Sequence, residues 1–112
     1  MRHWAVWTRQ TISESDLKIF VEDHGGEWQD EPSLRQGVIG KGQASIFLSV
    51  VDPRAEEFVD QLSRIKTLLG ATPLGGVDIH ISHVEGSTDL AEIMARAVCR
   101  KWNGLVDSHL SG

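Results

Sequence analysis

The feature of the sequence that most restricts its fold is a helical stripe between two strand-like runs. Residues 44–51 form an apolar run typical of a central strand, and residues 77–82 alternate between apolar and polar side chains, which is typical of a half-buried strand. Between them, Asp52-Pro53 is a typical helix start and Gly70 a typical stop. The apolar positions of this helix are Ala55, Phe58, Val59, Leu62, Ile65 and Leu69. This strand–helix–strand order predicts a mixed α/β structure.

The other segments continue the alternation. Further strands are expected at residues 3–8, 34–39 and 105–106, and further helices at about 13–24 and 88–102. Gly40-Lys41-Gly42 predicts a hairpin turn after the second of these strands. The acidic segment 27–34 contains Pro32, and its pattern leaves a bent strand and a loop open. The helix at 88–102 is apolar around most of its circumference, so we expect burial on two sides, against the sheet and the helix that starts at Asp52.

The predicted order is β-α-β-β-α-β-α-β, in a single domain that spans residues 1–112. Its first six elements match the ferredoxin-like order. The expected fold class is therefore α/β, of the α+β kind, with a mainly antiparallel sheet and helices on one face. The polar positions 78, 80 and 82 fit a second face that is partly open.

Cysteine content and hydropathy indicate the compartment. Cys99 is the only cysteine, so no internal disulfide and no zinc site of paired cysteines is expected, which suits a reducing cytosol. No apolar run approaches the length of about 18 residues that a membrane span needs, and no apolar core follows the basic start of the chain. We therefore expect a cytoplasmic protein without a membrane partner.

The formal net charge of −5 is unevenly distributed. Residues 14–60 hold eleven acids and four bases, a balance of −7. Nucleic acid is a poor partner for such a surface because phosphates need clustered lysine and arginine, whereas opposite fields favour a basic protein. Charge runs are more often solvated faces, but five acids fall here within ten residues that contain no base. The predicted partner-binding residues are Glu22, Asp23, Glu27, Trp28, Asp30 and Glu31.

No catalytic or metal site is expected. Asp78, His80 and Ser82 are the residue types of a hydrolytic triad, but neighbours two apart on a strand point outward in parallel, about 7 Å apart. A metal held by Asp78, His80 and His83 would need the chain to turn after Ser82 and further ligands from elsewhere. Cys99 lies near the end of its helix, away from the N-terminus that would activate a thiol. We therefore predict no enzyme activity and no cofactor.

The C-terminal half, about residues 60–107, resembles small bacterial immunity proteins that neutralise polymorphic or contact-dependent growth-inhibition toxins. The residues that carry the resemblance are Leu68-Leu69-Gly70, Pro73, Val77-Asp78-Ile79-His80-Ile81-Ser82, Gly86-Ser87-Thr88-Asp89-Leu90-Ala91 and Trp102-Asn103-Gly104-Leu105-Val106-Asp107. The resemblance implies a cytosolic antidote that binds the C-terminal domain of a cognate toxin, many of which are nucleases with basic clefts.

The main functional hypothesis is therefore an immunity protein that binds a basic toxin domain through its acidic surface. A ferredoxin-like regulatory or small-ligand-binding domain is the second hypothesis, and it predicts a defined cavity. A small enzyme that uses His80 or His83 is the third, and it predicts a cleft with ionisable groups of shifted pKa.

Overall fold

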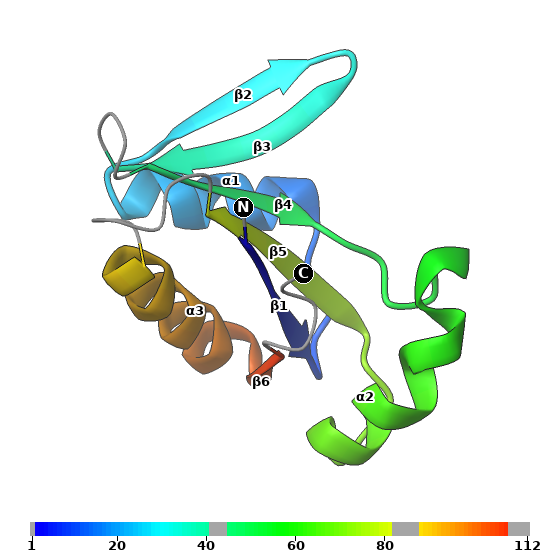
Figure 1. Cartoon of the computed structure of the whole chain (residues 1–112). Coiled ribbons are helices and arrows are strands. Elements are labelled where there is room, and N and C mark those ends of the chain that lie inside the picture. Colours follow the sequence, from blue (N-terminus) through cyan, green and yellow to red (C-terminus); the bar gives the residue numbers. More distant parts are fainter. Residues whose placement is uncertain (1, 41–44, 82–87, 108–112) are drawn as a thin grey trace.

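The computed structural model describes residues 2–40, 45–81 and 88–107. These residues form six strands in one antiparallel sheet with the order β2-β3-β4-β5-β1-β6, together with three α-helices (Figure 1). The elements in chain order are β1 (Arg2–Thr8), α1 (Glu14–Asp23), β2 (Glu27–Glu31), β3 (Leu34–Ile39), β4 (Ile46–Val50), a 3₁₀ helix η2 (Glu56–Gln61), α2 (Leu62–Leu69), β5 (Gly75–Ile81), α3 (Thr88–Trp102) and β6 (Gly104–Asp107).

The acidic segment 27–34, left open by the sequence, contains a strand. β2 ends at Glu31, and Pro32 lies in the two-residue turn that leads into β3. Proline costs no ladder hydrogen bond at such a turn, because its missing N–H has no strand partner there. The strand expected at 34–39 and the helix expected at 88–102 are confirmed. The turn expected at 40–42 lies largely outside the described residues.

The predicted helix start at Asp52-Pro53 is wrong. Asp52 and Pro53 lie in a turn, in which the Asp52 Oδ1 accepts a hydrogen bond of 2.9 Å from the backbone N–H of Arg54. The carboxylate therefore closes a local turn instead of capping a helix, and helical structure begins four residues later, at Glu56. Val59, placed in the apolar stripe, is 63% exposed because the η2 segment turns it outward. The predicted stop at Gly70 is confirmed by its left-handed φ of 73°.

The sheet order differs from the ferredoxin-like prediction. β5 lies between β4 and β1 and pairs antiparallel with both, whereas a ferredoxin-like sheet places the first strand beside a parallel neighbour. The η2–α2 segment accounts for the difference. It lies near one end of the strands and returns the chain directly beside β4, so β4 and β5 are related as in a wide hairpin and no crossover is formed (Figure 1).

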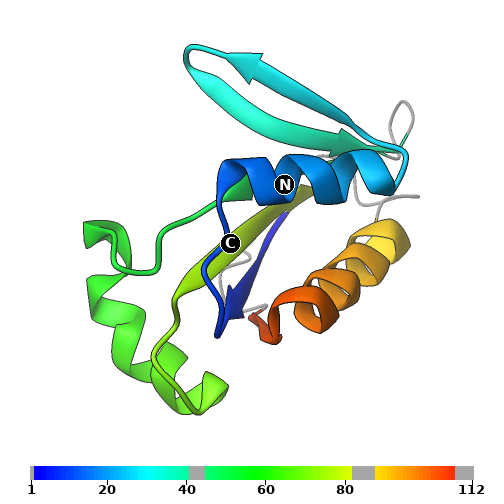
Figure 2. The same ribbon diagram turned by 180° about the vertical axis from the view of Figure 1, so that it is seen from behind.

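The helices also cover two faces of the sheet, not one as expected. α1 and α3 pack on the face that carries Val6 and Ile79, and Figure 2 shows both in front of the sheet. Ile65 of α2 packs with Ala5 and Trp7, which alternate with Val6 and therefore point to the opposite face. Small residues make room for this second cluster, since a Cβ on Gly76 would lie 2.9 Å from the Trp7 ring.

The two-sided burial predicted for α3 is wrong, because α2 lies on the other face of the sheet and does not cover α3. One row of its residues faces the sheet, and Ile93 outside that row is 57% exposed. The buried row is Ala91, Met94, Ala95, Val98 and Trp102. No helix in the described part of the chain is long and apolar enough to cross a membrane.

Candidate functional site

The β2–β3 hairpin extends beyond the rest of the sheet. β2 pairs with β3 along its whole length, but β3 pairs with β4 only through Gly37–Ile39. The half of the hairpin nearest Pro32 is therefore a two-stranded ribbon, which projects from the body of the molecule in Figures 1 and 2. Such a ribbon is marginal alone and needs anchors. Arg35 provides one, because its Nη1 lies 3.1 Å from the Glu14 carboxylate on α1 and its Nε lies 3.5 Å from Asp30.

Two of the six predicted partner-binding residues have intramolecular roles in this anchoring. Asp30 pairs with Arg35 across the hairpin. Trp28 is half-buried and packs against the main hydrophobic core, on the face that α1 covers. Trp28 therefore has less surface to offer to a partner, whereas the Asp30 side chain stays 70% exposed beside Arg35.

The other four predicted residues carry free carboxylates. Glu22, Asp23, Glu27 and Glu31 are all exposed, and none of these carboxylates has an ion pair or hydrogen bond with another described residue. Glu27 and Glu31 point to the sheet face that α1 leaves uncovered, and Glu22 and Asp23 end α1 just before the β2 strand begins. We call these four carboxylates the acidic edge, because they lie around the outermost strand of the sheet.

The local charge balance is strongly negative. Residues 14–39, which form α1, β2 and β3, hold seven acids and two bases. Their balance of −5 equals the net charge of the chain, so the remaining residues are neutral as a set. Since α1 packs against β2 and β3, the whole excess charge is concentrated in one part of the molecule.

The two ends of α1 differ in their electrostatics. At its start, Ser13 and Asp16 form a capping box, in which the Ser13 hydroxyl oxygen accepts from the Asp16 backbone N–H and the Ser13 backbone N–H donates to the Asp16 carboxylate. The bond from the Ser13 backbone N–H lowers the pKa of the Asp16 carboxyl. At its end, Glu22 and Asp23 face the negative pole of the helix dipole, and no basic residue lies in the last turn. The first arrangement stabilises the helix and the second does not, so the acidic edge is maintained at a local cost.

The sheet face opposite α1 and α3, part of which α2 covers, holds a cluster of ionisable side chains on β1 and β5. The His3 Nδ1 lies 3.1 Å from the Asp78 carboxylate, and the His3 ring stacks on His80 with centroids 4.4 Å apart. Burial, and then the neighbouring His3, lower the pKa of His80. Its Nε2 is buried and has no hydrogen-bond partner within residues 2–40, 45–81 and 88–107. Asp78 thus orients His3 and not His80, contrary to the order that a triad along β5 would require.

The described residues assemble no reaction centre around this cluster. Ser82 and His83, the other residues considered for a triad or a metal, lie outside the described residues. Within the described ranges, no group of three or more His, Cys, Asp or Glu side chains is arranged to hold a metal ion. Cys99 is half-buried, and burial raises the pKa of its thiol. Sequence reasoning missed the role of His3, because only the register of β1 on β5 brings it to Asp78.

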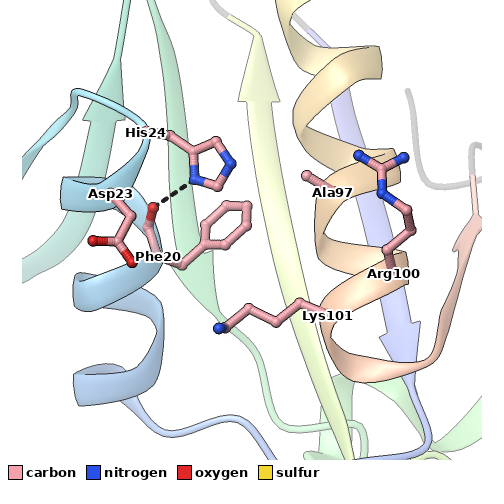
Figure 3. A pocket seen from close by; sticks show the side chains of 6 residues that line it. All are labelled: Phe20, Asp23, His24, Ala97, Arg100 and Lys101. Carbon is pink, nitrogen blue, oxygen red and sulfur yellow. Dashed lines mark hydrogen bonds between the residues drawn. The ribbon is translucent and has the colours of Figure 1, made fainter.

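A surface groove of about 320 Å³ lies between α1 and α3 (Figure 3). Phe20, Asp23 and His24 form one wall, where the His24 Nδ1 lies 2.8 Å from the Phe20 carbonyl oxygen. Arg100 and Lys101 lie on the other wall, and the Lys101 side chain reaches across toward α1. The sequence held no signal for this groove, since it depends on how two distant helices are placed.

This arrangement contains no preformed catalytic constellation among the described residues, and the four carboxylates of the acidic edge are exposed. Comparisons of the chain with protein-family models, with curated protein sequences and with solved structures gave no significant match, and its function must therefore be inferred from its own residues.

Proposed function

We propose that this protein binds a basic protein partner through the acidic edge and thereby neutralises it, as an immunity protein does with the C-terminal domain of its toxin. The observation that carries the proposal is the set of four exposed carboxylates, next to a projecting hairpin, that have no ion-pair or hydrogen-bond partner among the described residues. Elsewhere on the same elements, Glu14, Asp16 and Asp30 are all engaged in capping or ion pairs. The free carboxylates are the ones available to a partner.

The electrostatics favour capture of a basic surface. A field of one sign concentrated on one part of a molecule raises the rate of encounter with an oppositely charged partner, and this effect weakens with salt. Where the partner's basic surface is a cleft that holds an anionic substrate, carboxylates placed in it compete with that substrate. Neutralisation therefore needs no catalytic residue in this chain.

The test is affinity capture of the tagged protein from its native cells at low and at high salt, with the partner identified by mass spectrometry. We expect one stoichiometric basic protein with a toxin-like C-terminal domain, retained better at low salt. The charge-reversal variant Glu27→Lys/Glu31→Lys should lose it. The matched control is Glu56→Lys/Glu57→Lys, which reverses two exposed acids on η2, away from the acidic edge.

Capture that is equal for both variants would refute the proposal, because a partner held through another surface does not depend on these carboxylates. Recovery of no basic partner would do the same.

The groove between α1 and α3 supports a second candidate, the binding of a small anionic ligand. Its volume is near the lower end of the range of about 300–1,000 Å³ that small-molecule sites occupy. Arg100 and Lys101 would contact the anion. Trp102 lies beside the groove, with its ring centroid 5.4 Å from that of Phe20. A ligand recovered with the purified protein should change tryptophan fluorescence, and an Arg100→Gln/Lys101→Gln variant should not respond.

A further inference from the structure

We propose that the partner docks on the acidic edge by adding an extended basic segment as a seventh strand along the free side of β2. This inference rests on the proposed function and specifies its mode of binding. β2 has β3 as its sole neighbour in the sheet order, so one side of its backbone has no strand partner in the described residues. All residues of β2 are exposed except Trp28, which is half-buried. Strand addition to such an edge is a common way to bind an extended peptide.

Hairpin geometry identifies the backbone groups that are available. Glu31 and Leu34 close the two-residue turn, and such a closing pair exchanges both of its hydrogen bonds. Hydrogen-bonded and non-bonded positions alternate along the strand, so Glu27 and Gln29 also bond toward β3. Trp28 and Asp30 consequently direct their N–H and C=O groups to the free side.

The side chains select the chemistry of the incoming strand. In a sheet, side chains on neighbouring strands that share a face lie about 4.5–5.5 Å apart, and opposite charges there are favourable. Glu27 and Glu31 share the face that α1 leaves uncovered, and both lack an ion-pair partner among the described residues. A strand with lysine or arginine at every second position would place its cations beside them.

A second copy of this chain is disfavoured in the register that pairs the two β2 strands along their full length. Antiparallel pairing of two β2 strands centred on Gln29 would place Glu27 of each copy opposite Glu31 of the other. Like charges directly opposite each other destabilise a strand pair. The acidic edge therefore disfavours self-association and favours a basic occupant.

The decisive variant is Asp30→Pro, with Asp30→Asn as its matched control. Both variants remove the same charge, but only proline also removes the N–H that points to the free side. Proline is tolerated on the outer side of an edge strand, because that N–H takes no part in the ladder with β3. The probe is a blocked peptide of about nine residues in which arginine alternates with threonine, a length that spans a typical strand.

Strand addition predicts that Asp30→Pro binds the peptide up to about tenfold more weakly than Asp30→Asn in a calorimetric titration, the loss expected for about one well-made hydrogen bond to the strand edge. In the unaltered protein, saturating peptide should slow hydrogen exchange at the Trp28 and Asp30 amides specifically. Equal affinities of the two variants, or unchanged exchange at both amides, would overturn the inference. The exchange measurement decides on its own if the proline variant does not fold.

Failure of the strand-addition inference can be distinguished from failure of the proposed function. If Glu27→Lys/Glu31→Lys weakens binding while Asp30→Pro matches Asp30→Asn, the acidic edge binds through its side chains alone and only strand addition is wrong. If, instead, Glu27→Lys/Glu31→Lys leaves capture of the cellular partner unchanged, the proposed function is wrong as well.

Discussion

The end of α1 provides a test in which binding and stability should change in opposite directions. Glu22 and Asp23 are exposed in the last turn, where the carbonyl ends of the helix are already negative. Neutralising them as Glu22→Gln/Asp23→Asn should therefore stabilise the folded protein. It should also weaken binding of the basic partner, because two of the four carboxylates of the acidic edge are lost.

The magnitude follows from the geometry of the helix end. An unfavourable charge in the last turn of an exposed helix costs about 0.3–1 kcal/mol. Lys18 lies one turn before Glu22, and their i,i+4 interaction stabilises the helix by at most about 0.2–0.5 kcal/mol, which the variant would lose. The double variant should gain about 0.5–1.5 kcal/mol in the free energy of unfolding. With a urea m-value of about 2 kcal/mol/M, the midpoint should rise by about 0.25–0.75 M.

Urea unfolding followed by tryptophan fluorescence measures this gain, and the start of the same helix supplies the control. Glu14→Gln removes an acid that the helix dipole favours and that pairs with Arg35, so its midpoint should fall. Both shifts should shrink in high salt, because exposed charges are screened. An unchanged or lower midpoint for Glu22→Gln/Asp23→Asn would refute the claim that the acidic edge is kept at a cost in stability.

Two further predictions concern buried polar groups. The Asp107 carboxylate is 3% exposed and accepts hydrogen bonds from the Trp7 Nε1 at 3.2 Å and the Arg64 Nη2 at 2.9 Å, so Asp107→Ala should lower the free energy of unfolding by about 3–5 kcal/mol. Thermal unfolding measures this loss, and a loss below about 1 kcal/mol would contradict a structural role for the cluster. The pKa of His80 is lowered in the folded state, so below about pH 6.5 the folded protein binds fewer protons than the unfolded chain. The free energy of unfolding should therefore fall as the pH drops from about 6.5 to the folded pKa of His80. His80→Gln should reduce this decline in urea midpoints between about pH 7.5 and about pH 5, and an equal decline in both proteins would show that His80 is not its source.

Local chemistry made several elements predictable. The strand at 34–39 and the helix at 88–102 follow from hydrophobic spacing, and the stop of α2 at Gly70 follows from the freedom of glycine to adopt a positive φ. The alternation of side chains along a strand also places Trp4 and Trp7, three residues apart, on opposite faces, in the two core clusters. These features depend on residues close together in the chain.

The wrong expectations depend on contacts between distant residues. The position of β5 between β4 and β1 is set by where α2 packs, and α2 packs where Ala5 and Gly76 leave space beside Trp7. The Asp78 carboxylate meets His3 because Ala5, two residues along β1, is its register partner. No periodicity in a single sequence contains that information.

The sequence of β2 predicts a strand only weakly, for a reason that bears on the role of β2. Glutamate and aspartate are depleted in strands, so an acidic segment with a proline predicts a strand poorly. The same residues, however, suit an edge: their charges repel a second copy of the edge, while the backbone at Trp28 and Asp30 remains free to pair. An apolar edge strand would have been easier to recognise and would have been open to unspecific pairing. The proposed addition of a basic strand would account both for the weak sequence signal and for the acids on this outermost strand.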